Sequence, residues 1–458
     1  MLQRRVRLRR AAPHHRHGEL PLVNVRAALL RLHRWTGLVL AGFLSLVALT
    51  GIPLAWYDAL DAAAAPALHQ VSPPAAGAAR IDALVLRERV ARFVPAAVMP
   101  ATPLGGQAGR SVAFPVWLHE DGAAGPVLHE VFVDPHDGAI LGQRRWGDLR
   151  EGLRNLMPFL HRIHTALLFE GIGELLLGIV ALAWTLDGFV GAWLTLPPRT
   201  RSRRQAPSSS VWQHWAPAWR VRWQGGPHKR NFDLHRAGGL WLWAALTLMA
   251  WSSVALTLPA VYDPVMRAGL SYQLDPRRGA AATAGDPMSH ERARDAGRQL
   301  MAQLAAREGF AVLGEHWLAL DTRRNQYRYS VRSSRDLRTR SGATSVVFDA
   351  VNGQLVGSHL PTGRAAGDTV KHWLTSLHMA ALWGWPLQVA VALVGVVTLV
   401  LSLTGIWLWW TRRRARQYGP LPAATAATSL NSPASASAAR ASSTASTPTA
   451  TKVAPKDR

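Results

Sequence analysis

Four histidines recur at matching positions in the two halves of the chain. His33 and His235 each lie in a Leu-His-Arg sequence, which is followed by Gly-Leu at the head of an apolar run. His164 and His378 are each followed by an Ala-Leu element and then, at the same spacing, by a Gly-x-Trp-Leu sequence. Imidazole is a common protein ligand of transition metals. A duplicated helix pair with duplicated histidines suits a planar metal cofactor held from both faces, so we interpret the chain as a haem-binding electron carrier.

The duplication also predicts which histidines pair. In a bundle with a pseudo-two-fold axis along the membrane normal, equivalent residues face each other. We therefore expect His33 opposite His235 and His164 opposite His378, as axial ligands of two haem irons. Bis-imidazole ligation leaves no open iron position and suits electron transfer rather than oxygen chemistry, so we assign no catalytic residue. One such histidine alone would more often bond lipid head groups or backbone, but four in symmetric register favour ligation.

Two further histidines lie near the predicted ligands. His161 lies three residues before His164, on roughly the same helix face. His372 precedes His378, but the repeat aligns His161 with Thr375 instead. Three roles stay open for both: supporting the ligands from behind, serving as alternative ligands of the outer haem, or being simple surface histidines.

Three acidic residues on the second apolar helix have no acidic counterparts in the second half. Glu170 and Glu174 are one turn apart and could line a polar pocket near the outer haem. A dinuclear metal site that joins them to the neighbouring histidines is disfavoured, because it needs several converging carboxylates. Asp187 could neutralise an arginine such as Arg199 or Arg236, or reach a haem propionate through a bridging arginine.

Composition and charge indicate a membrane protein. The chain has 458 residues and a formal net charge of +24. Its arginines crowd beside the apolar runs, as in the cytoplasmic segments of membrane proteins, so we expect membrane lipid and no nucleic acid as the partner of this charge. The chain has no cysteine, which excludes Cys-ligated iron–sulfur clusters, thiolate haem and covalent c-type haem. The expected cofactor is therefore haem without a covalent link to the chain, in two copies.

Four apolar segments can cross a membrane, since about 20 residues span its hydrocarbon core: Trp35–Leu54, Leu175–Leu196, Leu240–Leu258 and Val389–Trp410. The first is predicted to be an uncleaved anchor. The basic tails and the basic middle segment predict cytoplasmic N- and C-termini. The expected order is a basic cytoplasmic tail (1–30), a membrane helix (31–57), a periplasmic domain (58–158), a membrane helix (159–197), a cytoplasmic loop (198–233), a membrane helix (234–259), a periplasmic domain (260–370), a membrane helix (371–411) and a disordered cytoplasmic tail (412–458).

The two long outer segments also repeat each other. Residues 132–142 and 347–357 both have the pattern of a strand, an Asp/Asn-Gly turn and a strand, and helical patterns precede them at 81–93 and 289–308. Together with the alternating strand at 326–331, these patterns predict a small α+β domain in each segment. The predicted fold is a membrane all-α four-helix bundle of two duplicated helix pairs, with two periplasmic α+β domains.

An ordered set of motifs carries a family resemblance. It comprises the Leu-His-Arg-Trp-Thr-Gly-Leu sequence at His33, the Asn-Phe-Asp-Leu-His-Arg sequence at His235, the elements after the other two histidines and two Asp-x-x-x-Gly-x-x-x-Gly hairpins. Over about residues 25–415 the chain resembles the PepSY-associated transmembrane (PepSY-TM) family. The resemblance implies PepSY-like outer domains, haem b as the cofactor, and an iron-regulated inner-membrane protein, similar to ferrisiderophore reductases that carry b-type haem between their helices. No Gly-x-Gly-x-x-Gly opens a βαβ unit, so the flavin reductase module of some relatives is not expected and the electron donor stays unidentified.

Two functions from different classes remain. The first is an oxidoreductase of the bacterial inner membrane, a transmembrane di-haem ferric-chelate reductase. A quinol or cytoplasmic flavoenzyme would donate electrons, and a periplasmic Fe(III)–siderophore or other ferric chelate would accept them and release its iron, because the softer, less charged ion binds oxygen ligands weakly. The alternative is a non-enzymatic, membrane-anchored PepSY interaction module that regulates a periplasmic partner such as a protease.

Overall fold

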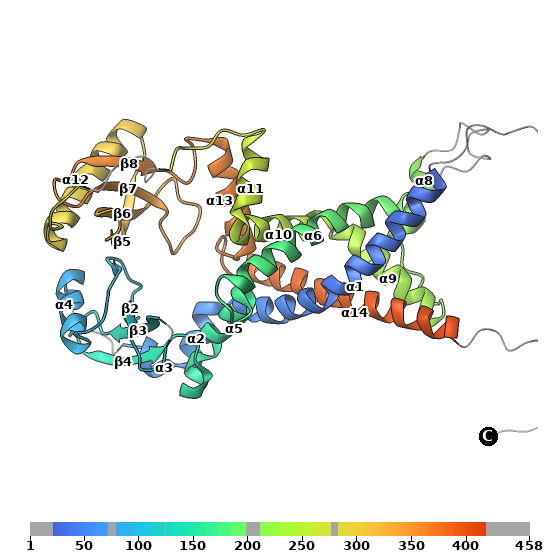
Figure 1. Ribbon diagram of the computed structural model, residues 1–458, viewed down its shortest axis with the longest axis horizontal. Helices are drawn as coiled ribbons and strands as arrows, with labels where there is room; N and C mark the ends of the chain where they lie inside the picture. The colour runs from blue at the N-terminus through green and yellow to red at the C-terminus, as the bar shows by residue number, and fades with distance from the viewer. Residues whose placement is uncertain (1–21, 72–78, 124, 198–210, 276–282, 418–458) are drawn as a thin grey trace, which may run out of the picture. The chain divides into compact units, whose positions relative to one another are not determined.

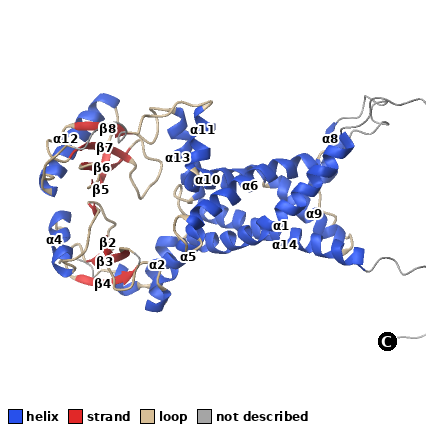
Figure 2. Ribbon diagram, viewed as in Figure 1, coloured by secondary structure: helices blue, strands red, loops and turns tan. Residues whose placement is uncertain are grey.

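The structure is a computed structural model. It combines long apolar helices (Figure 1) with two α+β regions, each of which has an antiparallel sheet (Figure 2). The predictions for residues 1–21, for the arginine-rich start of the middle loop and for residues 418–458 fall outside the described residues. Residues 22–30 and 412–417, which we predicted to belong to the tails, are helical instead. The structure describes residues 22–71, 79–123, 125–197, 211–275 and 283–417.

The described residues contain three helices that are long and apolar enough to cross a membrane, or four if one bent pair counts as a single span. α1 and α10 both pack against α6 (Figure 1). The spans are Val25–Leu54 within α1 (Leu22–Leu54), α6 (Ile172–Thr195), Trp385–Ala415 within α14 (Trp385–Gln417), and the bent pair α9 (Pro227–Trp241) and α10 (Trp243–Thr257).

The third predicted membrane helix is not continuous. Its two parts, α9 and α10, meet at an angle of 68°, and Leu242 between them has non-helical dihedral angles (φ −105°, ψ 13°). The pair Gly238-Gly239 precedes the bend, and glycine pairs are a common cause of helix kinks. Beyond the bend, the indole N–H of Trp243 donates to the carbonyl of Gly188 on α6 at 3.1 Å.

The predicted second and fourth membrane helices are also interrupted. α5 (Leu156–Ala166) ends before α6 begins, and α13 (Ala366–His378) ends before α14 begins. Leu167 and Ala380 have positive φ in these breaks. His164 and His378 therefore lie at the ends of separate short helices, and their predicted place at the heads of the membrane-spanning helices is wrong. The left-handed conformation is rare for leucine and alanine, but each break also contains a glycine with positive φ, Gly171 and Gly384, and glycine is the residue that marks such a turn.

The first lobe contains the sheet β2-β3-β4, in which neighbouring strands are antiparallel. Leu86 and Val90 of its helix α4 pack against buried valines and Phe114 of the sheet. Arg144, buried on β4, donates two 2.8 Å hydrogen bonds to the Asp61 carboxylate and thereby ties α2 to the sheet. The elements are α2 (Tyr57–Ala64), α3 (Pro66–His69), α4 (Ala83–Phe93), β2 (Val112–Leu118), β3 (Val127–Val133), β4 (Ile140–Arg145), and the 3-10 turns η1 (Leu149–Glu151) and η2 (Leu153–Asn155).

The second lobe is built on the sheet β1-β5-β6-β7-β8. Its helix α12 is N-capped by Ser289, whose side chain accepts from the Arg292 N–H. Strand β1 belongs by sequence to the first lobe but pairs with β5 in the sheet of the second lobe. The repeat did not predict this contribution. The elements are β1 (Ala101–Pro103), α11 (Pro259–Arg267), α12 (His290–Glu308), β5 (Val312–Asp321), β6 (Gln326–Ser333), β7 (Thr344–Asp349) and β8 (Leu355–His359); α8 (Val211–Trp215) and η3 (Ala216–Trp219) lie in the middle loop.

Glu315 on β5 is the centre of an ion-pair cluster between the two lobes. It accepts hydrogen bonds from Arg294 and Arg298 of α12 and from the hydroxyl of Tyr329 on β6. Arg294 also bonds Asp82, the N-cap of α4 in the first lobe. Arg294 therefore connects α12 of the second lobe to the N-terminus of α4 in the first lobe.

Glu315→Gln is expected to flatten the pH dependence of the second lobe's stability. Burial raises the pKa of Glu315, but its three hydrogen-bond donors outweigh burial and lower the pKa to about 2, against about 4.3 in an unfolded chain. The unfolded state therefore binds more protons, so this stabilisation is complete above about pH 4.3 and is lost as the pH falls toward 2. Melting temperatures of the full chain in detergent would test this. The control is Asp286→Asn, which changes an exposed acid of the same lobe outside the cluster. Parallel acid profiles for wild type and E315Q would contradict the prediction.

Candidate functional site

The structure brings together the two histidine pairs that the duplication predicts. His33 on α1 and His235 on α9 have ring centroids 6.3 Å apart and ring planes inclined by 59°. His164 at the end of α5 and His378 at the end of α13 have centroids 6.5 Å apart and planes inclined by 60°. We call the His33/His235 pair the first level and the His164/His378 pair the second level.

The two levels lie at different heights along α1. His33 is on this helix, and the second level contacts it at Val47 and Thr50. Because an α-helix rises about 1.5 Å per residue, the two levels are roughly 25 Å apart. Each level draws one histidine from each half of the chain, so neither half could form a level alone.

At the second level, the Nδ1 atom of each imidazole is held by a neighbouring helix. Nδ1 of His164 lies 3.1 Å from both the carbonyl of Val47 and the hydroxyl of Thr50 on α1. Nδ1 of His378 lies 2.7 Å from the hydroxyl of Ser252 on α10. Thr50 and Ser252 follow the first histidine of their halves at the same spacing. Both hydroxyls therefore belong to the repeat, although the sequence analysis did not single them out.

At the first level, Nδ1 is held as well, but by different groups. Nδ1 of His235 lies 3.1 Å from the carbonyl of Leu401 and 3.1 Å from the hydroxyl of Thr404, both on α14. Nδ1 of His33 lies 3.0 Å from the carboxylate oxygen Oδ2 of Asp187 on α6, although the ring is turned away from ideal hydrogen-bond geometry. A histidine ligand normally engages its second ring nitrogen with such a carbonyl or carboxylate, which fixes the ring's orientation.

The remaining ring nitrogens fit a metal between the rings. Among the described residues, no hydrogen bond uses Nε2 of any of the four histidines, which leaves these atoms available as ligands. An imidazole nitrogen binds a metal at about 2.0–2.1 Å, and its ring centroid lies about 1.2 Å further back, so two opposed ligands place their centroids about 6.4 Å apart. The observed separations of 6.3 Å and 6.5 Å agree with this spacing.

Glycines leave the space that the imidazoles occupy. A Cβ atom on Gly51 would lie 2.9 Å from Cε1 of His164, and one on Gly191 would lie 3.2 Å from Cε1 of His33. Gly405, the counterpart of Gly191, lies against the histidine of α9, at 3.4 Å. Close packing of an imidazole on the facing helix therefore explains Gly191, whereas a Cβ atom at Gly405 would make only an ordinary contact.

The two additional histidines contact other protein groups. His161 packs edge-on against Tyr57 and Trp146, with centroid separations of 6.2 Å and 5.5 Å. His372 is buried, and its Nε2 accepts from the backbone N–H of Leu337 at 3.4 Å. These contacts favour a packing role for both residues over direct ligation.

The three acidic residues of the second apolar segment do not make the contacts that we predicted from the sequence. Glu170 and Glu174 are exposed, and Glu170 pairs with Arg162 at 3.0 Å, so they do not line the polar pocket that we predicted near the outer haem. Asp187 contacts a histidine, whereas Arg236 pairs with Asp233. The suggested Arg236 partner of Asp187 is therefore also wrong, and Arg199 lies outside the described residues. In the part of the chain that the structure describes, no three His, Cys, Asp or Glu side chains form a possible metal site, so the dinuclear alternative has no support.

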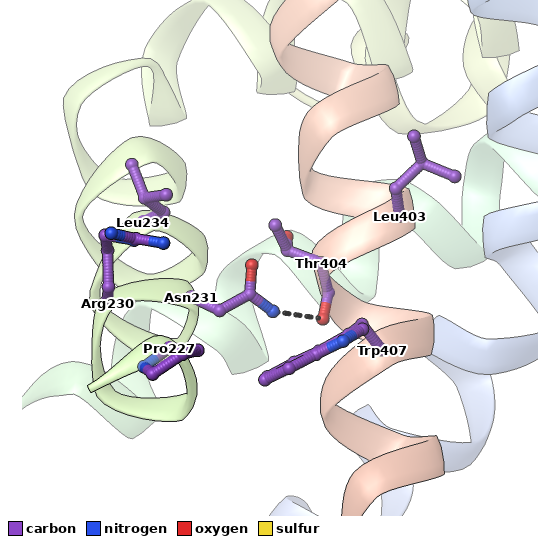
Figure 3. A pocket seen from close by; sticks show the side chains of 7 residues that line it. All are labelled: Pro227, Arg230, Asn231, Leu234, Leu403, Thr404 and Trp407. Atoms are coloured by element: carbon purple, nitrogen blue, oxygen red, sulfur yellow. Dashed lines mark hydrogen bonds between the residues drawn. The ribbon is translucent and has the colours of Figure 1, made fainter.

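A cavity of about 420 Å³ lies between α9 and α14, beside the first level. Asn231 points from α9 toward α14 and donates to the carbonyl of Thr404 at 3.3 Å (Figure 3). Since the hydroxyl of Thr404 contacts His235, one side chain separates the cavity from the first level. No local sequence pattern predicts this cavity, although Asn231 opens the motif that contains His235. The lining residues are Pro227, Arg230, Asn231, Leu234, Leu403, Thr404 and Trp407.

Comparison with known proteins identifies one family. A family model described as the PepSY-associated TM region matches residues 30–412, a stretch that contains both levels and both lobes. No curated protein matches the chain.

Proposed function

Because the chain belongs to the PepSY-associated TM region family and is a membrane protein, we propose that it is a haem-b-containing electron-transfer protein. The observation that carries this proposal is the doubled arrangement of imidazoles, with Nδ1 held by a helix and Nε2 available at a spacing that suits a metal. His33 and His235 would hold one haem, and His164 and His378 the other. Haem b, when bound, supplies a reversible one-electron couple.

The surroundings of the levels support electron transfer rather than oxygen chemistry. Two imidazoles on one iron leave no position for oxygen. The helices hold each imidazole through Nδ1, which keeps the rings in one orientation and limits the rearrangement that accompanies a change of charge. The separation of the levels, roughly 25 Å along α1, covers most of a hydrocarbon core about 30 Å thick.

An electron donor would bind at one end of the helix bundle and an electron acceptor at the other. The cavity beside the first level combines apolar walls with Arg230 and Asn231, a lining that suits a small amphipathic donor such as a quinol head group. The second level lies at the end of the bundle from which the chain enters both lobes, where a ferric chelate would be reduced. We place the first level toward the cytoplasm and the lobes in the periplasm of a bacterial inner membrane, because the basic segments flank the first level.

We expect the full chain, purified in detergent from haem-sufficient cells, to contain two low-spin haem b groups. Pyridine haemochrome assays give the number, and optical and electron paramagnetic resonance spectra give the spin state. In sealed vesicles, a reductant on the side of the first level should reduce an Fe(III) chelate on the other side, whereas protein-free vesicles should not. Haem-free protein would refute the proposal and favour the interaction module; two haems without ferric reduction would refute only the choice of acceptor.

A further inference from the structure

Asp187 breaks the symmetry between the two halves. The Gly-x-Trp-Leu repeat aligns Asp187 on α6 with Leu401 on α14. Where Asp187 offers His33 a carboxylate oxygen at 3.0 Å, Leu401 offers His235 only its backbone carbonyl, at 3.1 Å. At the second level, both imidazoles are held by neutral hydroxyl and carbonyl groups. Among the described groups that contact the four imidazoles, only Asp187 carries a negative charge, and it contacts a histidine of the first level.

Burial of the Asp187 carboxylate within the membrane-spanning helices costs free energy. Asp187 is only 9% exposed and lies in the second half of a membrane-spanning helix. Its only ion-pair contact among the described residues is His33, and its other oxygen, Oδ1, has no hydrogen-bond partner there. A buried charge is retained at such a position when a partner compensates it. Glu174 on the same helix is exposed, so burial distinguishes Asp187 from the other acidic residue of α6.

We propose that Asp187 positions His33 and lowers the reduction potential of the first level relative to the second level. This inference rests on the proposed function. A carboxylate beside Nδ1 of a ligating histidine makes the imidazole more basic. Its negative charge also stabilises the oxidised, more positive state across a medium of low dielectric constant. One electron then moves favourably from the reduced first level to the oxidised second level, and Asp187 gives the symmetric bundle a direction.

The test is a redox titration of the intact protein, monitored by its absorption spectrum. The wild-type chain should show two distinct potentials. Asp187→Asn and Asp187→Leu, the latter copying the other half, should raise the lower potential and leave the higher one unchanged. We expect about a tenfold change in the equilibrium, equivalent to about 59 mV for one electron. Glu174→Gln, which removes an exposed acid from the same helix, is the matched control and should change neither potential.

The outcomes separate this inference from the function on which it rests. Wild-type protein without haem would overturn the proposed function. Two haems whose potentials are both unchanged in D187N would overturn the role of Asp187 and leave the function standing. If D187N loses one haem, the potential of the remaining haem decides: retention of the higher one supports the inference, and retention of the lower one overturns it.

Discussion

His235→Ala is expected to remove or convert to high spin one of the two haems, while the other stays low-spin. His378→Ala should affect the other haem instead. The reason is that each level draws on its own pair of imidazoles, and the levels are roughly 25 Å apart along α1. Haem stoichiometry and the low-spin resonances of the purified variants would measure this. His228→Ala is a suitable control, because His228 is also on α9 but packs against Trp407, at a centroid separation of 5.9 Å.

Both ligand variants should also abolish electron transfer across vesicles. A single remaining haem cannot bridge a hydrocarbon core about 30 Å thick. If the histidines were only interfacial, their loss would cost a hydrogen bond worth about 1 kcal/mol and leave transfer intact. A variant that keeps two low-spin haems and normal ferric reduction would show that its histidine is not a ligand.

Gly51→Leu is expected to empty the second level without a change to any histidine. The Cβ atom alone would lie 2.9 Å from Cε1 of His164, and the hydrogen bonds of His164 to Val47 and Thr50 leave the ring little freedom to move. The variant should retain about one haem per chain, with the spectrum of the first level. The pyridine haemochrome assay and the absorption spectrum would measure both.

Gly42→Leu provides the matched control for this substitution. Gly42 lies on the same helix, and a Cβ atom there would meet nothing within 4 Å. The control should therefore keep both haems and reproduce any general effect of leucine on α1. Equal haem content in the two leucine variants would mean that the space at Gly51 does not limit the position of His164.

Several features could be predicted from the sequence because they depend on local patterns. The helix α12 with its Ser289 N-cap and the β3–β4 and β7–β8 hairpins follow from periodicity and turn residues. The expected histidine pairs followed from duplication, since two copies of one helix pair that pack face to face bring equivalent residues together. Whether these pairs bind haem stays a prediction.

The positions of other features could not be predicted from the sequence, because they depend on backbone conformation and on contacts between distant segments. The breaks before α6 and α14 begin at left-handed Leu167 and Ala380, a conformation that neither side chain signals, although Gly171 and Gly384 mark a turn in the same breaks. The strand β1 joins the sheet of the other lobe, which local patterns cannot show because strand pairing is a long-range choice.

The sequence by itself determined that apolar helices and two α+β lobes form, because these depend on local periodicity. It also determined that four histidines recur in register, because the two halves can be aligned. Only the tertiary structure decided what holds each imidazole. Asp187 looked like a partner for an arginine, and its contact with His33 appears only once α1 and α6 are packed together. The sequence shows that Asp187 stands where the repeat has Leu401, but only the packing of α1 on α6 shows which imidazole the carboxylate contacts.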